Sequence, residues 1–176
     1  MLIHFLLDIV KYTIAGSAVF FIAWFVVKEE IENAGRRKAL ELKKIAVETT
    51  LPLRLQAYER MVLFVERINP SSLLLRTHVP GSSVAESQQM LIAEIRNEFQ
   101  HNITQQIYIS QMSWSVISKL KEDTISLINN TAKAVPSDAP AVELSKLILT
   151  NMAAIGESPY DSAITLVKED LQHLFY

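Results

Sequence analysis

The chain has 176 residues with a formal net charge of −2 at pH 7, and 49% of its residues are hydrophobic. This near-neutral charge argues against a dedicated nucleic-acid-binding protein, because such a protein needs a basic surface to displace counterions. The lack of cysteine excludes disulfide scaffolds, thiolate zinc sites and thiol nucleophiles, while only 4 glycines and 6 prolines disfavour a turn-rich all-β fold and favour an all-α protein.

The first predicted element is a membrane-spanning helix. Residues 12–27 contain no charged residue and directly follow Lys11. At about 1.5 Å per residue this stretch covers roughly 24 Å, which is short of a hydrocarbon core of about 30 Å. Beginning the span at Ile9 supplies enough length if Lys11 extends its ammonium group to the headgroups. Tyr12 and Trp24 lie near opposite ends of the span, where aromatic side chains prefer the membrane interface.

The same stretch has two other interpretations, a cleaved signal peptide and a buried helix of a soluble protein. A signal peptide should begin with basic residues and end with small residues at a cleavage site. Here Asp8 precedes the apolar stretch, and bulky apolar residues end it. We therefore expect residues 1–27 to be a retained membrane segment. Residues 1–10 either continue the span or lie in the membrane interface.

The basic residues near the span lie mostly on its C-terminal side. Lys11 is the only basic residue before the apolar stretch. Within about 20 residues after the span, the basic residues are Lys28, Arg36, Arg37, Lys38, Lys43 and Lys44. Positive residues favour the cytoplasmic side, so we expect a single-pass protein with its N-terminus outside and its C-terminal domain in the cytoplasm. Lys11, Tyr12, Trp24, Lys28, Arg36, Arg37 and Lys38 are the predicted membrane-interface residues.

Residues 28–50 are predicted to form a charged stalk helix. They are rich in glutamate, lysine, arginine and alanine, and their few apolar residues lie mainly on one stripe. An alternative role for the basic cluster at 36–38 is to bind anionic lipid headgroups. Pro52 removes a backbone donor and restricts the residue before it, so we expect the helix to kink or restart there. Residues 51–176 are predicted to be the cytoplasmic helical domain.

The first helix of this domain is predicted to run to about Ile68 and to pack through one face. Its apolar residues recur at steps of four and three, which is typical of a packed helix pair or a coiled coil. The predicted partner-binding or packing seam consists of Leu55, Tyr58, Val62 and Val65, with Arg54, Arg60 and Arg67 along its polar edge. The pattern fits packing within the chain and packing against a partner equally well.

Two shorter elements are predicted next. Ser71 or Ser72 is expected to cap a short helical turn. Ser83 and Glu86 have the spacing of a capping box, which predicts a helix from there to about His101. Residues 103–110 alternate partly between apolar and polar side chains, which favours an extended segment.

Two breaks and three helices complete the predicted domain. Ser110 can cap a helix that ends near Asn129, and residues 141–155 form the next helix. Ser158 followed by Pro159 is a signal for the start of the last helix. The predicted inward residues of that helix are Tyr160, Ile164, Val167, Leu171 and Leu174.

The sequence contains no motif that indicates a reaction. A glycine-rich phosphate loop, a serine-hydrolase elbow and a zinc-protease motif are all missing. Two carboxylate-x-x-histidine pairs, Glu98 with His101 and Asp170 with His173, have a spacing found in di-metal helical bundles. Helical phase places both histidines near solvent. We therefore predict no catalytic residue, metal or cofactor, and a di-metal enzyme is the less favoured alternative.

Residues 51–76 (LPLRLQAYERMVLFVERINPSSLLLR), with 98–102 (EFQHN) and 105–110 (QQIYIS), resemble an uncharacterised family of bacterial membrane-anchored proteins. The resemblance covers most of the chain. It implies an N-terminal span and a helical cytoplasmic domain at the bacterial inner membrane, and it carries no assigned activity. A span followed by a charged helix is also similar to the peripheral-stalk b subunit of rotary ATP synthases, although several prolines interrupt this chain where those stalks are nearly continuous helices.

Together these patterns predict an all-α protein with one N-terminal transmembrane helix, a stalk helix and a small cytoplasmic helical bundle. The expected function is that of a non-enzymatic membrane-anchored scaffold or assembly subunit. It would act through helix contacts with a membrane complex or with a second copy of itself. The alternative is a peripheral-stalk-like or lipid-sensing subunit. The expected partners are membrane lipid and protein, with no nucleic acid.

Overall fold

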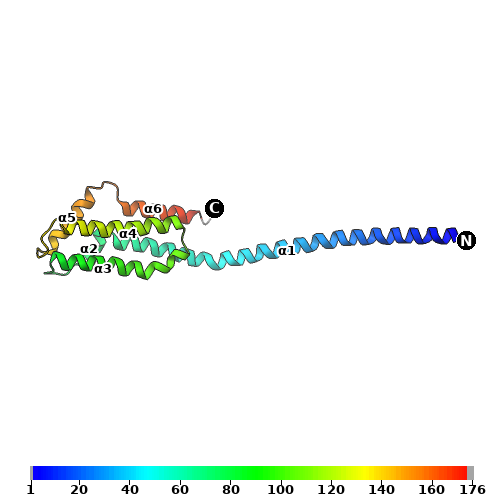
Figure 1. Ribbon diagram of the computed structural model, residues 1–176, viewed down its shortest axis with the longest axis horizontal. Helices are drawn as coiled ribbons and strands as arrows, with labels where there is room; N and C mark the ends of the chain where they lie inside the picture. Colours follow the sequence, from blue (N-terminus) through cyan, green and yellow to red (C-terminus); the bar gives the residue numbers. More distant parts are fainter. Residues whose placement is uncertain (1, 174–176) are drawn as a thin grey trace. The chain divides into compact units, whose positions relative to one another are not determined.

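The computed structural model describes residues 2–173 of the chain, without the side chains at positions 4 and 8. The described part is all-α, as predicted (Figure 1). Its helical elements are α1 (Leu2–Ile68), α2 (Pro70–Thr77), α3 (Val84–Asn102), the 3-10 helix η1 (Ile103–Ile107), α4 (Gln111–Ala132), α5 (Ala141–Ala153) and α6 (Pro159–Gln172). The chain divides into two compact units, Met1–Thr50 and Leu51–Tyr176.

The first unit is the N-terminal part of α1. Among its described side chains only that of Asn33 is partly covered, and all the others are exposed. Phe21, for example, is 74% exposed. A helix gains most of its stability from packing an apolar face. This unit therefore presents apolar side chains that no described residue covers.

Helix α1 continues through Pro52 and ends only at Ile68. Of the two outcomes predicted at Pro52, a kink or a restart, the restart is therefore wrong. Proline lacks one backbone donor and crowds the carbonyl four residues earlier. The helix persists after this position because its next turns, from Ala57 onward, are held by the core of the second unit.

The second unit is a helical bundle built around the last turns of α1. The buried residues of α1 recur at steps of three and four, as one helical face requires. They are Ala57, Tyr58, Met61, Phe64, Val65 and Ile68. The same core contains Leu91 and Ile95 of α3, Ile117 and Ile128 of α4, Leu144 and Ile148 of α5, and Val167 of α6. Helix α3 packs against α2, α4 and α5, and α4 packs also against α5 and α6.

Local capping signals begin three of these helices where the sequence predicts. Ser83 Oγ accepts a hydrogen bond from the Glu86 amide at 3.3 Å, and the Glu86 carboxylate accepts one from the Ser83 amide at 2.9 Å. These hydrogen bonds lower the pKa of Glu86. Ser110 caps α4, and Ser158 caps α6 by accepting from the Asp161 amide. The capping box and both serine caps are confirmed.

Two other local predictions are wrong. Helix α2 is capped by Asn69, whose side chain accepts from the Ser71 amide at 3.1 Å, and not by a serine. Residues 103–107 form a 3-10 helix in place of an extended segment. The alternation there does not mark a buried face, because Ile107 is 72% exposed.

The α2–α3 and α4–α5 loops cap each other's helices through peptide groups. The Val84 amide at the start of α3 donates to the Ala139 carbonyl at 2.9 Å. In return, the Ala141 amide at the start of α5 donates to the Ser82 carbonyl at 3.0 Å. Helix α5 follows Pro140 and has no side-chain cap, so this reciprocal contact satisfies an amide that the helix itself leaves unpaired.

Candidate functional site

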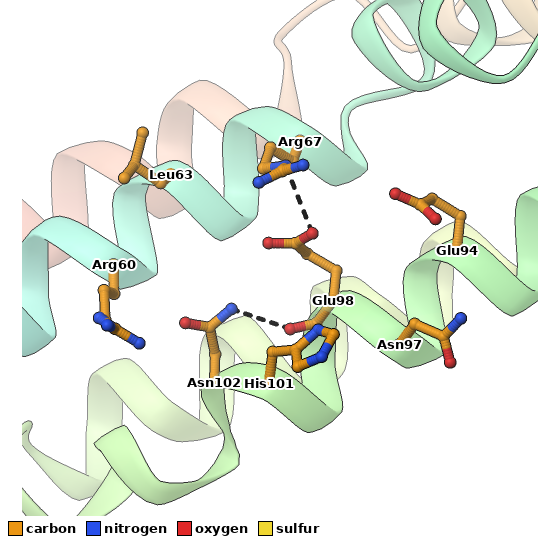
Figure 2. Close-up of a pocket in the computed structure, with 8 residues that line it drawn as sticks. All are labelled: Arg60, Leu63, Arg67, Glu94, Asn97, Glu98, His101 and Asn102. Atoms are coloured by element: carbon orange, nitrogen blue, oxygen red, sulfur yellow. Dashed lines mark hydrogen bonds and ion pairs between the residues drawn. The ribbon is translucent and has the colours of Figure 1, made fainter.

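A charged groove lies between the last turns of α1 and the C-terminal half of α3. Its volume is about 600 Å³. In Figure 2, Arg67 of α1 is joined to Glu98 of α3 and Arg60 is directed toward Asn102, whereas Leu63 points away from α3. The lining residues are Arg60, Leu63 and Arg67 of α1 and Glu94, Asn97, Glu98, His101 and Asn102 of α3. We call this feature the α1–α3 groove.

Helical spacing produces the two rows of the groove. Arg60, Leu63 and Arg67 are separated by three and four residues, so they lie on one side of α1. The α3 side chains have the same kind of spacing. Beneath the groove, Phe64 of α1 contacts Phe99 of α3, with ring centroids 5.7 Å apart. This apolar contact fixes the two helices and leaves the charged rows above it.

Ion pairs connect the rows and the neighbouring α2. Arg67 Nε lies 3.3 Å from Glu98 Oε2. Arg76 of α2 lies 3.0 Å from Glu94. Partly exposed pairs of this kind contribute about 0–1 kcal/mol each. They therefore orient the side chains more than they stabilise the fold.

Arg60 differs from the other arginines of the groove. Its side chain is exposed, and it forms no ion pair with any residue that the structure describes. His101 is exposed nearby, and Leu63 is 53% exposed between the two arginines. The groove thus offers an unpaired guanidinium, an imidazole and an apolar side chain on one surface.

The groove has the chemistry of a recognition surface. The eight described lining residues include two guanidinium groups and two carboxylates, which bind polar groups with good geometry. They also include the imidazole of His101 and the amides of Asn97 and Asn102. These groups can form hydrogen bonds and ion pairs with a polar ligand.

A second polar cluster joins α1, α4 and α6 around Asp170. The Oδ2 atom of Asp170 accepts hydrogen bonds from Tyr58 Oη at 2.7 Å, Ser110 Oγ at 2.5 Å and Ser113 Oγ at 2.6 Å. The Ser110 amide also donates to Tyr58 Oη at 3.3 Å. We call these four residues the Asp170 cluster. It connects residues up to 112 positions apart, so it stabilises the packing of three helices.

Hydrogen bonding and burial shift two pKa values in this cluster. Burial alone raises the pKa of Asp170, but the three hydroxyl donors outweigh it, so this pKa lies below its ordinary value. The pKa of Tyr58 is raised by burial and by its hydrogen bond to Asp170. Asp170 is therefore a carboxylate at neutral pH, and its accepted hydrogen bonds are charge-assisted.

The acidic residues of the two carboxylate-x-x-histidine motifs bind other side chains. Glu98 pairs with Arg67, and Asp170 accepts from hydroxyl groups. His101 and His173 are exposed, as helical phase predicts. Within residues 2–173, no group of three or more potential metal ligands lies close together.

The predicted seam of α1 is divided between core and surface. Tyr58 and Val65 are buried, and Val62 is half-buried against the core. Leu55 is 37% exposed and does not join the buried face. The buried face instead includes Ala57, Met61 and Phe64. It is therefore rotated about the helix axis relative to the predicted seam.

The three arginines at the predicted polar edge are also separated. Arg60 and Arg67 line the α1–α3 groove. Arg54 is half-buried, and its Nε donates to the Tyr108 carbonyl at 3.1 Å. Arg54 therefore fastens the segment that follows η1 and takes no part in the groove.

The predicted membrane-interface residues all lie in the first unit. The side chains of Lys11, Tyr12, Trp24, Lys28, Arg36, Arg37 and Lys38 are exposed. Helix α1 contains an 18-residue apolar window with a mean hydropathy of 1.8, none of which is buried. By length and composition, this helix could cross a membrane or act as a signal sequence.

Sequence reasoning considered Glu98, His101 and Asp170 only as possible metal ligands and did not predict the groove or the hydroxyl groups around Asp170. Glu94 and Asn97 lie on one face of α3, but nothing in their spacing indicates which helix lies opposite. The donors to Asp170 are separated from it by more than 50 residues. The only local signal was Ser110, which was predicted as a cap and also serves as a donor.

The chain belongs to a family of unknown function, DUF7935, which matches residues 4–174. This match confirms the predicted membership of an uncharacterised family. No curated protein and no solved structure matches the chain.

Proposed function

We propose that this protein is a single-span membrane protein whose helical C-terminal domain works in the cytoplasm as a non-enzymatic scaffold or assembly subunit. The setting we propose is the bacterial inner membrane, with the N-terminus outside. The observation that carries the proposal is the apolar window of α1, none of which is buried.

Exposure of this apolar window to water is energetically unfavourable. Burial of one large apolar side chain stabilises a protein by about 1.5–3 kcal/mol relative to leaving it exposed. Residues 12–27 include eight isoleucine, valine and phenylalanine residues. At roughly −0.3 to −0.6 kcal/mol each, they favour insertion into a bilayer by about 2.5–5 kcal/mol. A lipid environment therefore accounts for an apolar stretch that no described residue covers.

The α1–α3 groove is the contact surface that we propose for a protein partner. It combines exposed Leu63 with the guanidinium of Arg60, which pairs with no described residue, and arginine is enriched at binding surfaces. Anchoring the groove to a membrane raises its effective concentration toward partners in the same membrane, so weak contacts are sufficient.

Fractionation of the full chain tests the membrane span. We expect the wild-type chain in the membrane pellet after carbonate extraction. A Phe21→Asp, Ile22→Asp variant should move to the supernatant, because each acidic residue near a span centre costs about 2.5–3.5 kcal/mol. Leu40→Asp, outside the proposed span, is the control and should remain in the pellet. Recovery of the wild-type chain in the supernatant would contradict the proposal.

Protease accessibility tests the orientation. Protease added to intact cells should leave the C-terminal domain uncut, and opening the cells should allow its digestion. Digestion in intact cells would place the domain on the other side of the membrane.

Copurification after gentle solubilisation tests the groove. We expect a double variant, Arg60→Glu with Leu63→Asp, to lose a companion protein that the wild-type chain retains. Leu75→Asp is the matched control, because Leu75 is exposed on α2 and does not line the groove. A wild-type chain that purifies as a lone monomer would count against an assembly role.

A lipid-sensing stalk is the second candidate function. Arg36, Arg37 and Lys38 are exposed, and none forms an ion pair with a described residue. Neutralising all three should abolish binding to anionic liposomes if this function is correct. Unchanged binding by the neutralised variant would exclude these residues as the lipid contact.

A further inference from the structure

We propose that the α1–α3 groove binds an acidic segment of a protein partner, and that the guanidinium of Arg60 is the main contact for a carboxylate of that segment. This inference rests on the proposed function, in which the groove is the contact surface for a partner, and it names the chemistry of that partner. Its basis is the balance of charge in the groove once the ion pairs within the chain are counted.

The ion pairs of the groove leave one arginine unmatched. The charged residues that line it are Arg60, Arg67, Glu94 and Glu98. Glu98 lies 3.3 Å from Arg67, and only 14% of its side chain is exposed. Glu94 lies 3.0 Å from Arg76 of α2. Among the described residues, Arg60 is therefore the one charged lining residue without a counter-ion.

The helix that carries Arg60 offers it no acidic partner. A side chain on a helix reaches the residues three and four positions away. None of these positions is acidic, since they hold Gln56, Ala57, Leu63 and Phe64. Glu59, next to Arg60 in the chain, projects about 100° away around the helix axis. On the α3 side, Arg60 is directed toward the uncharged Asn102 (Figure 2). The charge of Arg60 is therefore available to a ligand.

The balance of charge favours a carboxylate ligand over a phosphate. A guanidinium binds either group through two parallel hydrogen bonds. A phosphate monoester carries a charge of about −1.5 to −2 at neutral pH. The groove has one unmatched positive charge, and Glu94 and Glu98 would repel a second negative charge on the ligand. A carboxylate, with a single charge, matches Arg60 alone.

The uncharged lining residues suit a peptide that carries this carboxylate. Asn97 and His101 are exposed along α3, and their side chains can form hydrogen bonds with peptide groups. Leu63 is 53% exposed on α1 and can contact an apolar side chain. The groove volume of about 600 Å³ lies in the range of sites for drug-sized ligands, so it holds a few residues of a partner.

Binding of a fluorescently labelled oligoglutamate peptide to the full, detergent-solubilised chain tests the inference. Its anisotropy should rise as wild-type chain is added, whereas an oligolysine peptide of the same length should show little change. Arg60→Gln should weaken oligoglutamate binding about tenfold, because it removes charge-assisted hydrogen bonds. Arg96→Gln is the matched control and should bind as the wild-type chain does, since Arg96 is exposed on α3 and does not line the groove. Equal weakening by the two substitutions, or equal binding of oligolysine, would overturn the inference.

The ion pairs also predict a variant that binds more tightly. Glu98→Gln removes the counter-ion of Arg67, so a second guanidinium becomes available and oligoglutamate should bind several times more tightly. Glu59→Gln is the matched control, because it removes an exposed acidic residue of α1 that does not line the groove. Equal effects of these two substitutions would show that the peptide responds to overall charge and would contradict recognition by the groove.

The outcomes separate this inference from the proposed function. If oligoglutamate does not bind, while the double variant Arg60→Glu with Leu63→Asp still loses a companion protein, the groove remains a partner surface and the acidic chemistry is wrong. Displacement of the peptide by inorganic phosphate at matched ionic strength would identify a phosphate site and would also overturn the inference. Absence of both oligoglutamate binding and a companion protein would contradict the groove as a contact surface altogether.

Discussion

The two units of this chain share one helix and use its apolar side chains in opposite ways. Leu42 in the first unit is 61% exposed, whereas Phe64 in the second is 1% exposed, although both belong to apolar stripes of α1. In the second unit, other helices of the same chain cover the stripe. The comparison teaches that helical periodicity predicts which face is buried and says nothing about which molecule covers it.

The largest expected effect on the free energy of unfolding comes from one of two matched phenylalanine substitutions. Phe64→Ala should lower the free energy of unfolding of the helical domain by about 3–5 kcal/mol, because it opens a cavity in the core. Phe21→Ala should leave that free energy unchanged, since Phe21 belongs to the first unit and is 74% exposed. Urea unfolding of the solubilised chain, followed by Trp114 fluorescence in a Trp24→Phe background, measures both. Equal effects of Phe64→Ala and Phe21→Ala on the free energy of unfolding would contradict the distinction between the two units.

Removal of the Asp170 carboxylate should have the next largest effect. Asp170→Asn replaces a charged acceptor of three hydroxyl groups with a neutral amide, and hydrogen bonds to charged groups contribute about 1.5–3 kcal/mol. Because the site is partly solvated, we expect a loss of about 2 kcal/mol in the same unfolding measurement. Glu169→Gln, exposed on the same helix, is the control and should change stability little.

The same residue predicts a pH dependence. The pKa of Asp170 is lower in the folded chain than its ordinary value of about 3.9. Its stabilisation is therefore fully present above that value and is lost as the pH falls toward the folded-state pKa. Unfolding curves between neutral and acidic pH should show this loss in the wild-type chain, and a smaller one in Asp170→Asn. Identical slopes for the two chains would refute the assignment.

The capping box of α3 should contribute less. Ser83→Ala removes the acceptor for the Glu86 amide and should cost about 1 kcal/mol in the unfolding measurement. Ser83→Asp retains a capping oxygen and should recover most of the loss. Failure of aspartate to restore stability would show that the cap is not the source of the effect.

The smallest expected effect on stability belongs to the groove. Arg67→Gln removes an ion pair with Glu98 that is partly exposed, so the free energy of unfolding should fall by about 0–1 kcal/mol. Loss of partner binding without loss of stability would identify the groove as a recognition surface. A stability loss larger than that of Ser83→Ala would show instead that the pair is structural.

Local signals in the sequence were sufficient to predict the helices. Ser83, Ser110 and Ser158 each cap a helix through contacts with residues three positions away. Tyr160 was predicted to point inward, and its hydroxyl lies 2.7 Å from that of the buried Thr124. Burial raises the pKa of Tyr160 to about 12, so this phenol stays protonated in the core.

The candidate site could be predicted only in part, because it depends on contacts between distant segments. Arg60 and Arg67 were predicted as a polar edge, and Glu98 and His101 were considered as metal ligands, but nothing indicated that these two pairs line one groove. Asp170 was considered only as a metal ligand, since its hydroxyl donors lie more than 50 residues earlier in the chain. Helical phase fixes the direction of a side chain and leaves its tertiary partner undetermined.

The reciprocal capping of α3 and α5 has a practical consequence for engineering this protein. Glycine- and proline-containing loops usually tolerate insertions. Here the Ser82 and Ala139 carbonyls each complete a helix that begins in the other loop. A tag inserted in either loop would unravel two helix starts at once. The turn around Gly156, whose left-handed backbone connects α5 to α6 outside this exchange, is the better place for a fluorescent or affinity label.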